Sequence, residues 1–551
     1  MFFQFSSLLS ELSKLNLSLS RTKQLHALIM RTHLAYDPFY ATKIIRFYAI
    51  NDDLLYARNL FEQTPQRSVY LWNSIIRAYA QAHRFEDAFF LFQTMLRTKT
   101  KPDSFTFACI MRACLEYVDL DRLRAVHGGL VVFGLGMDSI SGSALVSAYS
   151  KLGMVDDASR VFNRIPHPDL VLWNSIISGY GSCGLCEKAL ILFSEMRHIG
   201  VQPDGYTLVG LISGLADFSL LEIGHAIHGY CLKSSFDSNV HTSSILVSMY
   251  SRCGCLNSAQ RVFNGLLQPD LVTWSALITG YSQCGDHGNA LLFFRKMNLQ
   301  GKKADPILIA STLAASAQLA DIGRGSEIHG HVVRRGYESE VTVNSALIDM
   351  YSKCGFIGLG IKVFETMAKR NTISYNSVIS GLGLHGLSSQ AFKMFEEMLE
   401  KGFRPDDSTF SALLCTCCHA GLVKDGWEFF RRMKYEFGIQ AGAEHYIQMV
   451  RLLAMYGELE DAYNLILTLP GPVESGIWGA LLSCCDAHGN AELAEIAAER
   501  LFENKPEKTA YRVMLSNIYA GDGRWGDVEK LRDDMIKGGT WKMPGISWWR
   551  Q

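Results

Sequence analysis

One nine-residue phrase recurs along the chain at a fixed interval. It reads WNSIIRAYA from Trp72, WNSIISGYG from Trp173, WSALITGYS from Trp274 and YNSVISGLG from Tyr375, so that successive copies begin 101 residues apart. The register does not slip between copies. A strict period of this kind in a chain of 551 residues predicts a stacked array of repeats rather than several unrelated domains.

Each period contains three units. A second phrase, which begins at Tyr149, Tyr250 and Tyr351, marks another kind of unit within the period. If a boundary is placed after the recurrent Pro-Asp pair, the first period divides into units 69–103, 104–138 and 139–169, which have 35, 35 and 31 residues. Within a unit, two stretches with apolar residues at helical spacing are separated by a short Gly-containing break. Each unit is therefore predicted to be a helical hairpin.

The ends of the second helices are marked by glycine and proline. Gly200, Gly301 and Gly402 stand where a left-handed helix terminus is expected, and Pro203 cannot continue a helix. Small Ala189 beside bulky Phe193 allows paired helices to approach closely. Each hairpin can bury its remaining apolar face only against its neighbours, which predicts an α-solenoid.

Composition restricts the class of protein further. The chain is 48% hydrophobic and 19% charged, and its formal net charge of −1 excludes a uniformly basic nucleic-acid binder. The best candidate for a membrane span, PILIASTLAASAQLA from Pro306, is too short and is flanked by acids, so we expect no membrane segment. The 14 cysteines are scattered through helical patterns and are expected to be reduced core residues.

These units resemble a known repeat family. Units of 35 residues with WNSIISGY, an Ala-x-x-x-Phe-x-x-Met helix and a Gly-(Ile/Val)-x-Pro-Asp close resemble the pentatricopeptide repeat. The alternation of 35, 35 and 31 residues resembles its plant PLS subclass, in which AIHGYCLKSSF and LVSMYSRCGCLNSAQRVF look like the L and S variants. The tail, with IWGALLSCCDAHGNAELAEIAAERL, resembles the paired E motifs of organelle RNA-editing factors. The resemblance implies an all-α fold: a right-handed α-solenoid superhelix of about fourteen helical hairpins followed by a helical E region.

The register predicts the following organisation. The pentatricopeptide repeats span 38–474, as units 38–68, 69–103, 104–138, 139–169, 170–204, 205–239, 240–270, 271–305, 306–340, 341–371, 372–406, 407–442 and 443–474, followed by E-type motifs at 475–545 and a tail at 546–551. Residues 1–37 hold a first, degenerate L-type repeat. The same segment is rich in Ser and Leu and carries Lys14, Arg21 and Lys23 against one acid, Glu11, which is also typical of an organelle transit peptide. The expected location is the mitochondrion, with the chloroplast as the alternative.

In this family the fifth and last residues of a unit face single-stranded RNA and together read one base. Asn and Ser donate or accept hydrogen bonds while Asp only accepts them, so such a pair matches one base edge better than others. By resemblance, the uridine-reading pairs are Asn73 with Asp103, Asn174 with Asp204, and Asn376 with Asp406; the guanosine-reading pairs are Ser143 with Asp169, Ser244 with Asp270, and Ser275 with Asp305; and Ser345 with Asn371 is an adenosine-reading pair.

Other units are not assigned a base. The L-type pairs, Ala108 with Asp138, Val209 with Asn239, and Ala310 with Glu340, have little capacity to read one. A terminal Asp also has a purely structural interpretation, because Asp is a good N-cap for the next helix. That interpretation does not explain the small polar residues inside the preceding helix.

The sequence lacks the signature of a nucleic-acid deaminase. A nucleic-acid deaminase requires His-x-Glu followed by Pro-Cys-x-x-Cys, and neither half is present. The cysteine pair Cys183 and Cys186 has no Pro before it, and the periodic histidines lie too far apart to share an ion. We therefore expect no enzymatic activity, no metal and no cofactor.

The favoured function is that of a sequence-specific RNA adaptor that selects a site in an organellar transcript for C-to-U editing. Its expected partners are single-stranded organellar RNA, a deaminase recruited in trans and other editing-complex proteins, and it is expected to be a monomer. One alternative keeps RNA binding but assigns transcript stability, processing or splicing. The other is a helical protein-binding scaffold, which would have no reason to repeat Asn or Ser with Asp at unit boundaries.

Overall fold

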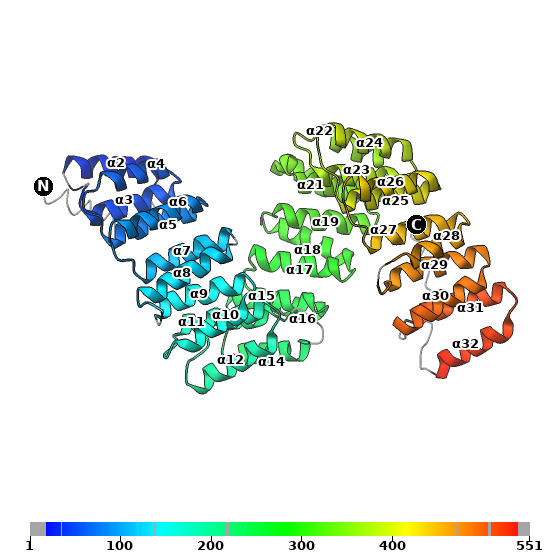
Figure 1. The fold of residues 1–551 in the computed structure, drawn as a ribbon, viewed down its shortest axis with the longest axis horizontal. Coiled ribbons are helices and arrows are strands. Elements are labelled where there is room, and N and C mark those ends of the chain that lie inside the picture. Colours follow the sequence, from blue (N-terminus) through cyan, green and yellow to red (C-terminus); the bar gives the residue numbers. More distant parts are fainter. Residues whose placement is uncertain are drawn as a thin grey trace. The chain divides into compact units, whose positions relative to one another are not determined.

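The structure is a computed structural model that describes residues 18–537, except 33, 35, 118, 137, 216–219, 237–238, 470 and 505–507. Nearly all of these residues lie in helices, and the described part of the chain contains no strand (Figure 1). The chain divides into two compact units, Met1–Gly280 and Tyr281–Gln551, and each unit is considered by itself.

The first unit begins with α2. It contains α2 (Leu19–Arg31), α3 (Pro38–Ile50), α4 (Leu54–Gln63), α5 (Val69–Gln81), α6 (Phe85–Arg97), α7 (Ser104–Tyr117), α8 (Leu120–Val132), α9 (Ser139–Lys151), α10 (Val155–Arg164), α11 (Leu170–Ser182), α12 (Cys186–His198), α13 (Gly205–Ser213), α14 (Leu221–Lys233), α15 (Val240–Arg252), α16 (Leu256–Asn264) and most of α17 (Leu271–Gln283).

The second unit runs to the end of the chain. It contains α18 (His287–Leu299), α19 (Pro306–Gln318), α20 (Ile322–Arg335), the 3₁₀ turn η2 (Tyr337–Ser339), α21 (Val341–Lys353), α22 (Ile357–Thr366), α23 (Thr372–Leu384), α24 (Ser388–Glu400), α25 (Asp407–Ala420), α26 (Val423–Tyr435), α27 (Ala443–Met455), α28 (Leu459–Leu467), α29 (Ser475–His488), α30 (Ala491–Asn504), α31 (Thr509–Gly521) and α32 (Trp525–Lys537).

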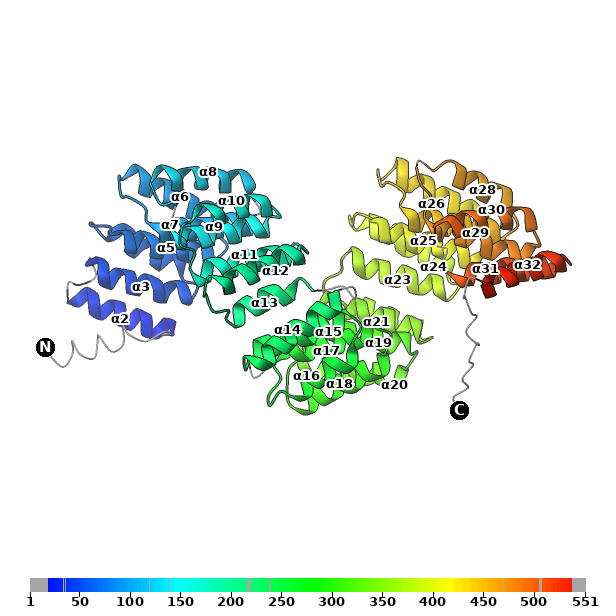
Figure 2. The same ribbon diagram turned by 90° about the horizontal axis from the view of Figure 1, so that it is seen from below.

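The helices pack as hairpins that stack in chain order. In α5, Trp72, Ile75 and Ile76 are completely buried, and the small Ala88 of α6 is buried as well. Helix α5 packs against its hairpin partner α6 and also against α3 and α7, the first helices of the neighbouring hairpins. The same scheme joins α19, α21, α23 and α25 in the second unit, and Figures 1 and 2 show it clearly from α2 to α6, in blue. First helices thus form one layer and second helices another. The predicted fold class, an all-helical repeat solenoid, is confirmed.

The predicted helix stops are also confirmed. Gly200, Gly301 and Gly402 each have a positive φ, between 73° and 86°, just after a second helix. Glycine adopts this left-handed conformation without the steric cost that a side chain brings. The chain can therefore reverse direction here and enter the first helix of the next hairpin.

Candidate nucleic-acid interface

The predicted reading residues lie at the beginnings of the first helices. The fifth residue of a unit stands in the second turn of its first helix, and the last residue precedes the first helix of the next unit. Asp204 and Asp406 are the N-caps of α13 and α25, and their carboxylates accept hydrogen bonds from the amides of Thr207 and Thr409. The structural interpretation of the terminal Asp as a helix cap is therefore correct for these residues.

The same carboxylates also hold the asparagines. The Nδ2 of Asn73 donates to Oδ1 of Asp103 over 2.9 Å, the Nδ2 of Asn174 to Asp204 over 3.0 Å, and the Nδ2 of Asn376 to Asp406 over 2.9 Å. The structure thus brings all three predicted Asn–Asp pairs into direct contact. The three asparagines are partly exposed, so each amide keeps one N–H with which to bind a ligand.

One of the serine pairs is joined in the same way. The hydroxyl oxygen of Ser244 lies 3.2 Å from Oδ1 of Asp270, 2.5 Å from the hydroxyl oxygen of Thr273 and 2.7 Å from the backbone oxygen of Val240 in its own helix. Burial by itself would raise the pKa of Asp270, but hydrogen bonds from Thr273 and Ser244 to the charged carboxylate hold that pKa below its ordinary value. The carboxylate is therefore ionised and accepts hydrogen bonds at neutral pH.

The remaining predicted pairs are not joined by a hydrogen bond. The hydroxyl of Ser143 donates to the backbone oxygen of Ile140 in its own helix, while Asp169 caps α11. Ser345 is buried and its hydroxyl has no partner among the described residues, whereas Asn371 caps α23.

Several further terminal residues act as helix caps. Ser275 and Asp305 belong to different compact units, and Asp305 caps α19. In the L-type pairs, Asp138 caps α9 and Asn239 caps α15, while Glu340 makes no side-chain capping bond.

Exposed apolar side chains lie three residues before the fifth residue in nine of the units. We did not identify these side chains from the sequence. They are the second residues of their units: Phe39, Tyr70, Phe105, Ile140, Val171, Tyr206, Val272, Ile307 and Ile373. Tyr70 is 74% exposed, and it lies one helical turn before Asn73 on the same face of α5. Apolar and aromatic faces of this kind can stack on bases. The sequence did hold the signal, because Tyr70, Val171, Val272 and Ile373 keep the 101-residue register.

The periodic histidines have a packing role. The Nδ1 atoms of His26, His127, His228 and His329 lie 2.7 to 3.0 Å from the hydroxyl oxygens of Tyr48, Tyr149, Tyr250 and Tyr351. Each bond joins the second helix of one hairpin to the first helix of the next. Within the described residues there is also no group of His, Cys, Asp or Glu that could hold a metal ion.

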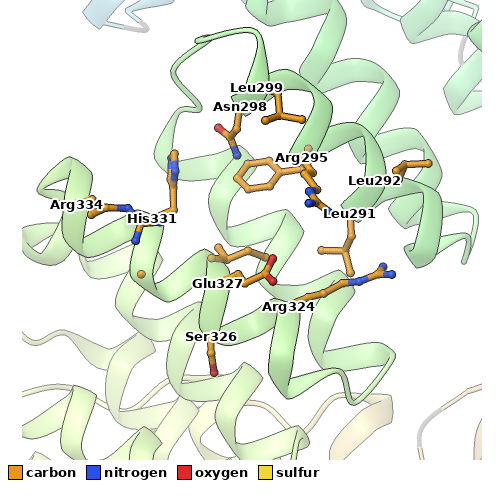
Figure 3. Close-up of a pocket in the computed structure, with 13 residues that line it drawn as sticks. Leu291, Leu292, Arg295, Asn298, Leu299, Arg324, Ser326, Glu327, His331 and Arg334 are labelled. Atoms are coloured by element: carbon orange, nitrogen blue, oxygen red, sulfur yellow. The ribbon is translucent and has the colours of Figure 1, made fainter.

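A cavity of about 610 Å³ lies in the second unit between α18 and α20 (Figure 3). It is lined by three arginines, Arg295, Arg324 and Arg334, and by Glu327 and His331. All its lining residues come from second helices. The predicted reading residues stand on first helices or just before them, so this cavity is separate from the candidate interface. Among the described residues, no helix is long and apolar enough to cross a membrane.

Comparison with known proteins identifies the repeats. The profile described as the PPR repeat family matches residues 67–116, 168–217 and 370–419, the profile of the PPR repeat matches 143–167, 272–301, 345–372 and 408–436, and the E motif profile matches 488–550.

Three relatives come from Arabidopsis thaliana. The pentatricopeptide repeat-containing protein At1g64310 is 51% identical over 96% of this chain and 96% of its own length. The mitochondrial protein At2g03380 is 32% identical over 98% of this chain and 79% of its own length, and the chloroplastic protein DOT4 is 34% identical over 96% and 73%.

Among solved structures, the fold is similar to that of the pentatricopeptide repeat protein PPR10 in complex with an 18-nt psaJ RNA element. The TM-score is 0.57 at 16% identity, over 90% of this chain and 83% of the other. The repeat profiles, the relatives and the shared fold agree, and the chain belongs to the pentatricopeptide repeat proteins, with PLS-type repeats and a C-terminal E motif.

Proposed function

We propose that this protein is a sequence-specific single-stranded RNA-binding adaptor that selects a site in an organellar transcript for C-to-U editing. The observation that carries the proposal is the repeated contact of Asn with Asp at the start of the first helices, beside exposed apolar side chains. A chain that only needed helix caps would not require the Asn.

The chemistry of the pairs matches base edges. Uracil presents an N–H between two carbonyl oxygens, and the amide of Asn376 offers both a donor and an acceptor to such an edge. A base that inserts beside this pair can stack against the exposed Ile373, which is 59% exposed. The serine pairs offer a hydroxyl and a carboxylate, and the donor groups of guanine complement such acceptors.

The comparisons support the RNA-binding part. PPR10, which shares the fold, is seen with a bound RNA element. The relatives include proteins named as mitochondrial and as chloroplastic, which supports an organellar location. The mitochondrion is our proposed location, with the chloroplast as the alternative.

The editing part rests on the E motif at residues 488–550. The chain has neither the His-x-Glu nor the Pro-Cys-x-x-Cys sequence of a deaminase. The deamination itself would be performed by a deaminase recruited in trans together with other editing-complex proteins. The adaptor would supply the choice of site.

The test compares organellar cDNA from a loss-of-function line with that from the wild type. We expect one or a few cytidines to remain unedited in the mutant line, each a few nucleotides 3′ of a sequence that fits the predicted bases, and editing to return on complementation. Unchanged editing with altered transcript ends, abundance or splicing would replace editing by the alternative role in RNA processing. Unchanged organellar RNA in every respect would favour the protein-binding scaffold.

A further inference from the structure

A threonine of the following unit contacts each Asn–Asp pair. Thr106, Thr207 and Thr409 are the third residues of units 104–138, 205–239 and 407–442, and all three are completely buried. Their hydroxyl oxygens lie 2.6, 2.6 and 2.7 Å from the Oδ1 atoms of the asparagines in the preceding units. The same three-residue network thus occurs three times.

The bonds around the hydroxyl fix the orientation of the amide. The Oγ1 of Thr409 accepts the backbone N–H of Asp406 over 3.1 Å, and its single proton lies between two acceptors, Oδ1 of Asn376 at 2.7 Å and Oδ1 of Asp406 at 2.9 Å. On its other side, the amide donates from Nδ2 to the carboxylate of Asp406. A rotated amide would place its carbonyl oxygen against the carboxylate and lose that bond, and its carbonyl oxygen would no longer accept the proton of the Thr409 hydroxyl.

We propose that Thr106, Thr207 and Thr409 are positioning residues that determine specificity, because each one holds the Asn of the preceding unit in a single orientation. This inference rests on the proposed RNA-reading function. A uracil has an N–H where a cytosine has an acceptor nitrogen, so an amide held in one orientation distinguishes the two bases. An amide that can rotate offers a donor or an acceptor at either position and distinguishes them less well. Reading at one unit thus depends on three residues, and the third belongs to the next hairpin.

Comparison of the units supports this role. Thr273 stands at the same position after the Ser244–Asp270 pair, and there the Ser hydroxyl is held by both neighbours. The Ser244 hydroxyl also lies within hydrogen-bond distance of Val240 in its own helix. After Ser143 and Asp169 the third residue is Leu172, which has no hydroxyl, and Ser143 bonds to Ile140 of its own helix without a hydrogen bond to Asp169. After Ser345 and Asn371 it is Ser374, whose hydroxyl bonds to the backbone of Asn371 and not to Ser345.

The experiment measures competition binding of the full chain to two single-stranded RNAs that carry the predicted bases and differ only opposite unit 372–406, with U in one and C in the other. The parent protein is compared with Thr409→Val, which keeps the shape but removes the hydroxyl, and with Thr409→Ser, which keeps the hydroxyl. We expect Thr409→Val to lower the preference for U over C about fivefold, as for one lost hydrogen bond, and Thr409→Ser to retain it within about twofold.

A matched control separates positioning from helix capping. Thr409 also completes the capping box of α25, and Ser374 completes the equivalent box of α23 without a hydrogen bond to the hydroxyl of Ser345. Ser374→Ala should leave the U over C preference unchanged, and circular dichroism of each variant at the assay temperature should match that of the parent. The inference is overturned if Thr409→Val discriminates as well as the parent, or if Ser374→Ala loses as much discrimination. A parent that itself shows no preference at this base would instead overturn the proposed RNA reading.

Discussion

At the scale of single residues, one carboxylate performs two tasks. Asp406 caps α25 through the backbone of Thr409, and it also holds the amide of Asn376 in the preceding hairpin. A helix cap and a reading residue are therefore not competing interpretations at this position. The capping bond from Thr409 holds the carboxylate of Asp406 in place, and this carboxylate in turn holds the side-chain amide of Asn376.

The histidine–tyrosine bonds are another contact made by single residues, and they make stability depend on pH. Burial lowers the pKa of His26 and His329 below the ordinary value of 6.5, and burial, with Arg164, also lowers that of His127. The folded chain thus holds these imidazoles in the neutral form. The unfolded chain takes up protons at a higher pH, so stability is fully present above 6.5 and is lost as the pH falls below it.

We expect the midpoint of thermal unfolding to be lower at about pH 5.5 than at about pH 7.5. The double variant His127→Gln and His329→Gln should show a smaller difference between the two pH values. The measurement is thermal unfolding followed by circular dichroism, with the exposed His198→Gln as a control that keeps the difference of the parent. An equal pH dependence in the double variant would show that other groups cause it.

At the scale of helices and turns, the first period departs from the others at its helix ends. His83 and Lys99 have φ values of 57° and 58°. One period later, Gly184 and Gly200 stand at the corresponding positions with φ values of 74° and 86°. The backbone is left-handed in both periods, but in the first one it carries side chains that disfavour that conformation. At these two turns the backbone has the same left-handed conformation, but the residue is not the glycine that adopts it without steric cost.

Lys99→Gly is therefore expected to increase the free energy of unfolding, by about 0.5 to 1 kcal/mol, because the relief of strain exceeds the added entropy of the unfolded chain. Lys101 provides the control, since it is another exposed lysine in the same loop and its φ is not positive. Lys101→Gly should not stabilise the chain. Chemical denaturation of the three proteins measures the effect, and equal behaviour of the two variants would contradict the backbone explanation.

At the scale of the whole molecule, the proposed function predicts that the order of units along the chain is the order in which bases are read. The family resemblance implies that RNA runs parallel to the repeats, with its 5′ end towards the N-terminus. From unit 69–103 to unit 372–406 the predicted bases are U, none, G, U, none, G, G, none, A and U. Within each compact unit the described hairpins pack mainly against their neighbours in the chain, so a change at one unit should leave distant bases unaffected.

An RNA with this order of bases is expected to bind more tightly than an RNA of the same composition with the order reversed. Each lost match costs about 1 kcal/mol, because one well-formed hydrogen bond is exchanged for a poor one. Competition binding at a fixed salt concentration measures the difference, since contacts with phosphates contribute equally to both RNAs. Equal affinity for the two RNAs would show that the register or the direction is wrong.

The sequence by itself determined the repeat, the helices and the turns, because apolar spacing and Gly and Pro positions act over a few residues and recur without a slip. It also placed the fifth and last residues of each unit at corresponding positions. Only the tertiary structure decided which of these residues meet. Asn73 and Asp103 are 30 residues apart and Thr106 lies 33 residues from Asn73, so their hydrogen bonds exist only once two first helices pack side by side. The Ser143 side chain has the same place in its unit but is shorter, the next unit has Leu172 at the threonine position, and the Ser143 hydroxyl bonds to its own helix. Local sequence patterns determine the position of a residue on its helix. The length of its side chain and the facing residue of the next hairpin determine which hydrogen bonds that side chain makes.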